Sequence, residues 1–201
     1  MPSAVWRPAS STGETLIDCK QVYQTGTSYN PRCLGLHGPI NVQYALMVSC
    51  NYFFYESGTR QGIDNIVKYS NQLGLGTKTG IELSEATGHV SSPEYYESVR
   101  QGQVDDTWTY GNVLQSAIGQ LDNAFTPLQM ANYVATLGNY GVRNQVSIVK
   151  GIEGIGETEK DDPYTIDVEK EDMEKVIEGM RRVVKNGTLS GIFAGLSLIH
   201  I

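Results

Sequence analysis

HGPINVQYALMVSCNYFFYESG, residues 37–58, begins with a His-Gly turn and continues as an apolar segment with helical spacing. Asn41 is suited to cap this helix, because its side chain can accept a hydrogen bond from a first-turn amide. Apolar or small residues then follow at the spacing of one helical face: Val42, Ala45, Leu46, Ser49 and Phe53. The spacing predicts a helix that carries Ser49 on or beside an apolar stripe.

Outward from this segment, two more stretches have strong helical signals. A second helix is predicted over residues 63–73, with Gly74 as its left-handed C-terminal cap. Thr126 followed by Pro127 is typical of a helix start. The small residues that follow predict a closely packing helix that ends near Gly141.

The other stretches have weaker signals. Residues 8–40 predict loops with one short strand, and residues 81–110 predict a long ordered loop, because neither stretch keeps a period. Residues 146–152 are a β-branched run that predicts a strand, followed by a solvated acidic loop. The helix expected over 171–186 has acidic residues first and basic residues last, which complements its dipole, so we assign it a structural role alone.

The composition is that of one folded domain. The chain has 201 residues, of which 40% are hydrophobic and 18% are charged. Its net charge of −7 argues against nucleic acid as a partner, because phosphate binding needs a clustered basic face. No apolar run reaches the roughly 18 residues that span a bilayer, and no secretory leader follows Met1.

Residues that bind metals or phosphates show no familiar spacing. The glycine-rich stretches 74–80 and 151–156 match neither a phosphate loop nor a dinucleotide fingerprint. The cysteines lack a C-x-x-C pair and the histidines lie far apart, so we expect no metal and no cofactor: Cys19, Cys33, Cys50, His37, His89 and His200. Two alternatives stay open for Cys19 and Cys33, namely a disulfide that closes a short loop or ordinary thiols.

Two stretches resemble the transpeptidase domain of penicillin-binding proteins, in particular its class B, elongation-type members. Residues 37–58 contain Ser49-Cys50-Asn51, which is similar to the family's S-x-N motif, and residues 111–141 resemble its G-x-x-x-Q-x-x-I-G-Q and T-P-L-Q block. The resemblance implies an α+β fold (an α/β sandwich) of the β-lactamase/transpeptidase type, truncated here. This chain would hold mostly the helical subdomain.

The resemblance also implies a function. The parent protein would be a penicillin-binding peptidoglycan D,D-transpeptidase at the extracytoplasmic face of the bacterial cell membrane, held there by an anchor absent from this chain. Its partners would be stem peptides, β-lactam antibiotics and proteins of cell elongation or division. Ser49 would relay a proton and Asn51 would bind the substrate's amide, and these are the two catalytic residues that we assign.

The family's nucleophile, the serine of an S-x-x-K motif, is not identifiable. An alignment on the prolines of residues 2–8 places Ala4 and Arg7 at the serine and lysine positions. We therefore expect residues 1–10 to be non-native sequence, residues 11–195 to be a partial transpeptidase domain, and residues 196–201 to be an adapter-derived tail. The fragment alone is expected to be inactive.

Lys78-Thr79-Gly80 spells the family's third motif, K-T-G, but it precedes the T-P-L-Q block, whereas the resemblance places the catalytic copy after it. We assign Lys78 no chemistry. Two alternatives to a transpeptidase fragment remain. One is a pseudoenzyme that binds stem peptides or a partner without catalysis. The other is a serine β-lactamase, for which Glu82 or Glu85 would be the nearest candidate base.

Overall fold

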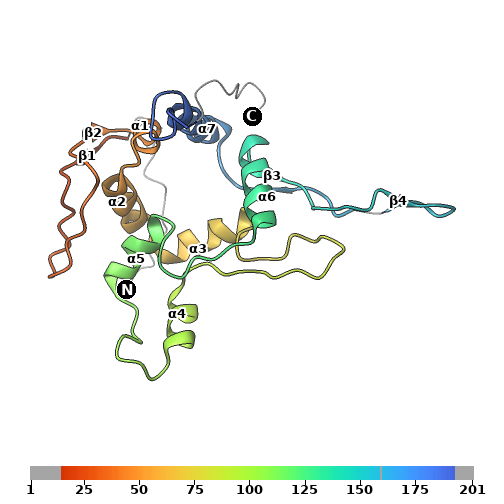
Figure 1. Ribbon diagram of the computed structural model, residues 1–201, viewed down its shortest axis with the longest axis horizontal. Coiled ribbons are helices and arrows are strands. Elements are labelled where there is room, and N and C mark those ends of the chain that lie inside the picture. The colour runs from red at the N-terminus through yellow and green to blue at the C-terminus, as the bar shows by residue number, and fades with distance from the viewer. Residues whose placement is uncertain (1–14, 159, 193–201) are drawn as a thin grey trace, which may run out of the picture. The chain divides into compact units, whose positions relative to one another are not determined.

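The computed structural model describes residues 15–158 and 160–192 (Figure 1). The chain divides into two compact units. Unit 1 comprises residues 1–53 and 174–201, and unit 2 comprises residues 54–173. Helices dominate the described residues, and the strands are short two-stranded pairs, so the fold is a mixed one that is mostly helical.

Unit 1 begins with a β-hairpin. Strand β1, Ile17–Cys19, pairs antiparallel with β2, Gly38–Ile40, so that Ile17 lies opposite Ile40 and Cys19 opposite Gly38. Ile17, Cys19 and Ile40 are buried, because alternate residues of a strand face the same side. A single bridge between Val22 and Arg32 continues the pairing toward the hairpin loop. The sequence predicted one strand in this region, and the structure has two.

The S-x-N segment is not one continuous helix. Helix α1, Val42–Met47, is capped by Asn41 as predicted, since its side chain accepts from the Tyr44 amide. The chain then leaves the helix at Ser49, whose φ of 53° is left-handed, and α2, Asn51–Gln61, starts afresh. The prediction of a single face through Ser49 and Phe53 is therefore wrong.

The break after α1 has the hydrogen bonds of a Schellman motif. The Ser49 amide donates to the Leu46 carbonyl at 3.1 Å, and the Cys50 amide donates to the Ala45 carbonyl at 2.9 Å. These bonds satisfy carbonyls that the end of a helix would leave unpaired. Serine occupies the position that is usually glycine, which explains why the helical spacing of the apolar residues concealed the break.

The last helix, α7, Lys170–Lys185, begins in unit 2 and continues in unit 1, and its position agrees with the prediction. Its buried side includes Met173 and Ile177. In unit 1 it lies close against α1, because a Cβ on Gly179 would come within 3.2 Å of the Gln43 Cα. Only glycine allows this close approach.

Unit 2 contains the other helices and two small strand pairs. The helices after α2 are α3, Ile63–Gln72, α4, Pro93–Arg100, α5, Tyr110–Ala117, and α6, Pro127–Gly138. The strands are β3, Val142–Arg143, paired with β6, Tyr164–Thr165, and β4, Gly151–Ile152, paired with β5, Gly156–Glu157. Helices α2 and α5 touch where Gly58 meets Ala117, since a Cβ on Gly58 would lie 2.3 Å from that of Ala117.

Two of the predicted helices in unit 2 are confirmed with their caps. Helix α3 is followed by Gly74 at φ 87°, and α6 starts with a capping box in which Thr126 and Gln129 exchange hydrogen bonds. The loop predicted over residues 81–110 is wrong in part, because Ser92 and Pro93 start the short helix α4 within it. Eight residues are too few to display a clear helical period.

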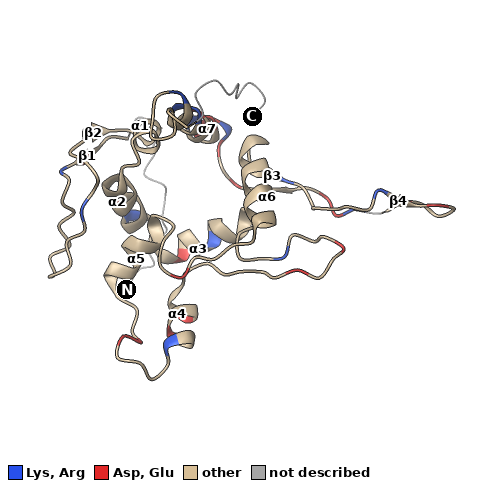
Figure 2. Cartoon of the chain, in the orientation of Figure 1, with Lys and Arg blue, Asp and Glu red and all other residues tan. Residues whose placement is uncertain are grey.

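The predicted strand over residues 146–152 is also wrong in part, because only Gly151 and Ile152 pair, in the β4–β5 hairpin. Charged residues of both signs lie along this hairpin (Figure 2), and its residues are exposed, as predicted for the loop that follows.

Among the described residues, no helix combines the length and the hydropathy needed to span a membrane.

Candidate functional site

The Ser49 hydroxyl is held by a turn that follows α7 in the same unit. Its oxygen lies 3.3 Å from the Thr188 hydroxyl oxygen, and the Thr188 amide donates to the Met47 carbonyl at 3.3 Å. Gly187 approaches so closely that a Cβ there would lie 2.3 Å from the Met47 oxygen. The contact between the C-terminal end of α1 and the turn at residues 187–188 thus fixes the backbone beside Ser49.

The middle residue of the motif points inward. Cys50 is fully buried and caps α2, since its sulfur accepts from the Phe53 amide at 3.4 Å. Ser49 and Asn51, on either side of it, are only half-buried. This alternation leaves a hydroxyl and a carboxamide partly accessible while the residue between them anchors the turn.

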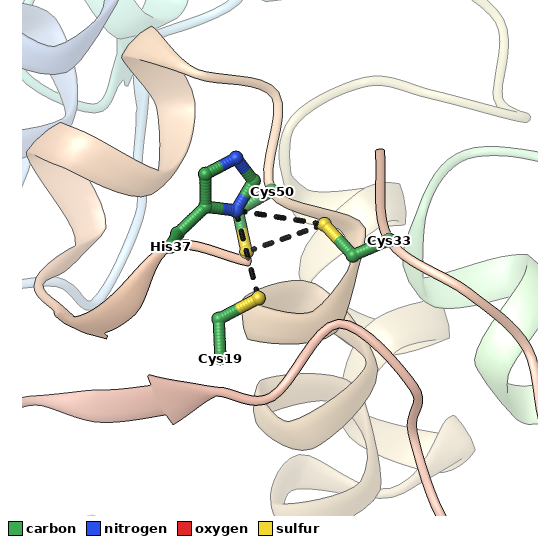
Figure 3. A group of neighbouring side chains, drawn as sticks. All are labelled: Cys19, Cys33, His37 and Cys50. Carbon is green, nitrogen blue, oxygen red and sulfur yellow. Dashed lines mark hydrogen bonds between the residues drawn. The ribbon is translucent and has the colours of Figure 1, made fainter. Parts of the chain in front are cut away.

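Cys50 belongs to a cluster of four side chains, which we call the thiol cluster: Cys19, Cys33, His37 and Cys50 (Figure 3). Their donor atoms all lie within 4.8 Å of one another. The His37 Nδ1 lies 3.5 Å from the Cys19 sulfur and 3.6 Å from the Cys33 sulfur, and the sulfurs of Cys33 and Cys50 are 3.7 Å apart.

Four separate places in unit 1 supply the thiol cluster. Cys19 ends β1, Cys33 follows the hairpin loop, His37 precedes β2, and Cys50 stands between α1 and α2. All three cysteines are buried free thiols. The Cys19–Cys33 disulfide, one of the two alternatives left open by the sequence, is therefore absent from this structure.

The thiols of the cluster differ in acidity. Burial alone would raise the pKa of Cys33, but hydrogen bonds with the backbone at Tyr52 and Gly35 and with the neighbouring thiols lower it below its ordinary value. Burial raises the pKa of Cys50 well above its ordinary value. A divalent cation among these sulfurs would favour the thiolate form of each.

The donor set fits a tetrahedral d10 ion. Three sulfurs and one imidazole nitrogen are the Cys3His ligands of structural zinc sites. The expectation of no metal site is not supported by this geometry, because the cysteines and the histidine of the site share no familiar spacing along the chain. Cys33 and His37 are in fact spaced C-x3-H, and the hairpin returns Cys19 to them. Of the other histidines, His89 stacks on Tyr95, and His200 lies outside the described residues.

The K-T-G tripeptide is engaged in a structural contact. The Glu85 carboxylate accepts from the Thr79 amide at 3.0 Å, the Thr79 hydroxyl at 2.8 Å and the Gly80 amide at 3.1 Å. Lys78 to Gly80 form no strand, although they help to line a cavity of about 250 Å³ in unit 2. These contacts support the assignment of no chemistry to Lys78.

The two glutamates considered as a hydrolytic base are both held by hydrogen bonds. The Ser147 hydroxyl and the Ile148 amide lower the pKa of Glu82 to about 2. The Thr79 amide is the main cause that lowers the pKa of Glu85, assisted by the Thr79 hydroxyl and the Gly80 amide. A general base works best with a pKa near the operating pH, so this arrangement disfavours a β-lactamase.

The sequence contains two further matches to the family's motifs, neither of which was predicted as a site. Ser147 to Lys150 is the one S-x-x-K in the sequence, and residues 28–30 form a second S-x-N. The first is not helical, and the Ser147 hydroxyl is bonded to Glu82 and to the Val149 carbonyl. In the second, the Asn30 side chain accepts from the Thr25 amide within the hairpin loop. Both are structural, while Ala4 and Arg7 lie outside the described residues.

Comparisons with known proteins agree with the motif pattern. The family described as the penicillin binding protein transpeptidase domain matches residues 5–198. The peptidoglycan D,D-transpeptidase MrdA of Acinetobacter baumannii is 30% identical over 161 residues, which are 78% of this chain and 23% of that protein. Penicillin-binding protein 2B of Streptococcus pneumoniae is 33% identical over 174 residues, with 76% of this chain and 23% of that protein covered.

Solved structures show the same relationship in three dimensions. PBP2 of Pseudomonas aeruginosa superposes with a TM-score of 0.79 at 25% identity, covering 92% of this chain and 42% of that one. PBP2 of Helicobacter pylori gives a TM-score of 0.74 at 25% identity, covering 92% and 34%. The chain thus spans about a quarter of the length of the curated relatives it matches. It belongs to the family of penicillin-binding protein transpeptidase domains.

Proposed function

We propose that this chain forms the S-x-N part of a peptidoglycan D,D-transpeptidase, in which Ser49 and Asn51 serve the acyl-transfer site. The observation that carries the proposal is the turn between α1 and α2. It holds Ser49 in a left-handed conformation, supports it with Thr188, and buries Cys50 so that Ser49 and Asn51 stay partly accessible.

The roles follow from the chemistry of the side chains. In acyl transfer the attacking hydroxyl loses a proton and the departing amine gains one, so a positioned hydroxyl such as that of Ser49 can relay the proton. Asn51 has both an amide donor and a carbonyl acceptor, which together match the backbone amide of a peptide substrate. Penicillin, whose carbonyl would react with the same nucleophile, would occupy the same place.

We extend the proposal to the substrates, location and partners of the enzyme. The substrates would be stem peptides of peptidoglycan, on the extracytoplasmic face of the membrane, and β-lactams would inhibit the enzyme. Related structures include a peptidoglycan synthase complex and a complex of PBP2 with MreC. These support an assembly partner from the cell-elongation machinery.

The test is acylation by a fluorescent penicillin in the full-length product of the gene. Ser49→Ala should reduce the second-order rate constant at least about 100-fold, the lower range of a lost proton relay. Ser98→Ala is the matched control, because the exposed Ser98 hydroxyl donates to the Tyr95 carbonyl within α4, away from the S-x-N turn in the sequence. An unchanged rate in Ser49→Ala with the protein folded would overturn the assigned role.

A second candidate is a non-catalytic stem-peptide-binding domain. It is favoured by one observation: the single S-x-x-K of the sequence, at residues 147–150, lies in non-helical chain with its serine bonded to Glu82. Intact-mass analysis of the full-length gene product after incubation with penicillin separates the two. An adduct that survives in Ser147→Ala supports the transpeptidase, whereas a complete lack of adduct together with measurable stem-peptide binding supports the second candidate.

A further inference from the structure

Asn186 and Gly187 follow the end of α7 and are the one Asn-Gly pair in the sequence. Asparagine before glycine deamidates readily, because glycine has no side chain to hinder attack of its amide nitrogen on the asparagine carboxamide. Asn186 is exposed, so water can reach it. The pair leads directly into Thr188, and Gly187 and Thr188 form the turn that supports Ser49.

We propose that Asn186 is a site of spontaneous deamidation, and that its isoaspartate product detaches the turn at residues 187–188 from α1 and from Ser49. The modification itself stands apart from the proposed function. Its effect on acylation rests on that function, because the effect passes through Ser49.

Both reacting groups of the pair are available. Within the part of the chain that the structure describes, neither the Asn186 carboxamide nor the Gly187 amide has a hydrogen-bond partner. The backbone amide of Asn186 donates to the Arg182 carbonyl at 2.9 Å, which keeps the residue attached to the last turn of α7. The carboxamide and the next amide nitrogen can therefore approach each other without first breaking a hydrogen bond of their own.

Asn139 provides a comparison within the chain, because it is also exposed and also follows a helix, α6. Its carboxamide donates to the Val142 carbonyl at 3.0 Å, and the amide of the next residue, Tyr140, donates to the Leu137 carbonyl at 3.1 Å. The tyrosine side chain also hinders attack by that amide. Asn139 should therefore stay intact under conditions that convert Asn186.

The reaction needs only water as a co-reactant. The Gly187 amide nitrogen gives up its proton and bonds to the Asn186 Cγ, while the bond from Cγ to the side-chain nitrogen breaks and ammonia leaves with that proton. Water then opens the resulting succinimide at either carbonyl. Opening at the backbone carbonyl gives isoaspartate, whose main chain runs through the former side chain, and opening at the other carbonyl gives aspartate. No oxidation or reduction takes place.

The longer main chain of isoaspartate has no room at this turn. The product adds one carbon–carbon bond to the backbone, about 1.5 Å. A Cβ on Gly187 would lie 2.3 Å from the Met47 oxygen and 2.8 Å from the Val183 Cα, so the chain is enclosed there. The turn must move away from α1, which breaks the hydrogen bond from the Thr188 amide to the Met47 carbonyl and separates the Thr188 and Ser49 hydroxyls.

The new negative charge is a smaller disturbance than the longer chain. The last turn of α7 contains Arg182 and Lys185, whose charges offset a carboxylate beside the C-terminal end of the helix. Asn186→Glu adds the charge without the extra backbone carbon. Asn186→Gln keeps the carboxamide but must close a larger ring, which is much slower. The two variants separate the effect of the charge from that of the backbone.

The first measurement is isoaspartate formation in the full-length gene product during incubation in mildly alkaline buffer. Peptide mapping by mass spectrometry, with isoaspartyl methyltransferase as the probe, should find the product at Asn186. Asn186→Gln should lose this signal, and Asn139 should remain unmodified. A folded wild-type protein that forms no isoaspartate at Asn186, or forms as much at Asn139, would overturn the proposal.

The second measurement compares the incubated protein with fresh protein. Hydrogen exchange of the peptide that contains Thr188 should become faster, and the rate of acylation by fluorescent penicillin should fall in proportion to the isoaspartate fraction. Fresh Asn186→Glu should keep the exchange and acylation of wild type. Unchanged exchange in the isoaspartate form would refute the detachment of the turn. Faster exchange with unchanged acylation would uphold the modification and refute the role proposed for Ser49.

Discussion

Two tripeptides of this chain spell motifs of the same enzyme family, and their surroundings differ completely. In Ser49-Cys50-Asn51 the middle side chain is buried among thiols and the outer two are partly accessible. In Lys78-Thr79-Gly80 the middle side chain is also buried, but both its hydroxyl and its amide donate to Glu85. The first motif presents polar groups outward, and the second uses them internally.

The difference shows that the hydrogen-bond partners of a motif identify its function better than its amino-acid sequence does. A hydroxyl that donates to a carboxylate of its own loop has no proton left to relay. A half-buried hydroxyl beside a neutral threonine keeps that capacity. Substitutions in and around each tripeptide should therefore have different consequences.

The largest expected effect is a loss in the rate of acylation. Asn51→Ala should reduce the rate of acylation by fluorescent penicillin at least about 100-fold in the full-length gene product, because one well-placed polar group is worth that much in a transition state. Lys78→Ala should leave the rate within about twofold. A large loss in Lys78→Ala would show that the K-T-G tripeptide is catalytic after all.

The next largest expected effect is on the stability of the fold, and it concerns the contact between Gly187 and the end of α1. Gly187→Ala should destabilise the fold by about 2–3 kcal/mol, because the added Cβ would lie 2.3 Å from the Met47 carbonyl oxygen. Gly191→Ala is the control, since a Cβ there meets no atom of the described residues within 4 Å. Chemical denaturation of both variants measures the difference. Equal stability of the two would mean that the turn at 187–188 does not press on α1.

A smaller effect is expected in the K-T-G loop. Glu85→Gln removes the charge from a carboxylate that accepts three hydrogen bonds, and the exposure of this loop limits the loss to about 1 kcal/mol. Exchange of the Thr79 and Gly80 amide hydrogens should accelerate, while penicillin acylation stays unchanged. Slow exchange at both amides in the variant would contradict the assigned role of Glu85.

The smallest expected effect is a pH dependence of the thermal stability, caused by Glu82. The pKa of Glu82 is lowered to about 2 by Ser147 and Ile148, so its ionised form stabilises the fold. That contribution is fully present above the ordinary value near 4.5 and is lost as the pH falls toward 2. The difference in Tm between wild type and Glu82→Gln should therefore shrink between pH 5 and roughly pH 2.

The sequence was sufficient for the elements with local signals. Thr126 with Gln129 and Asn41 with Tyr44 form caps from neighbouring residues, so their helices were predictable. The family was predictable from the order and spacing of its motifs. The thiol cluster was not, because its four members meet only after the hairpin pairs and α1 ends. The break at Ser49 was hidden for a related reason, since a left-handed serine has no distinctive neighbour in the sequence.

The left-handed backbone at Ser49 sets two kinds of selection against each other. A non-glycine residue in this region costs about 1–2 kcal/mol relative to glycine, so a screen for thermal stability alone should replace Ser49 by glycine. The replacement would relax the turn and delete the hydroxyl in one step. Selection for stability and selection for activity would then choose different residues at this position, and libraries built on this fold would need to hold residue 49 fixed.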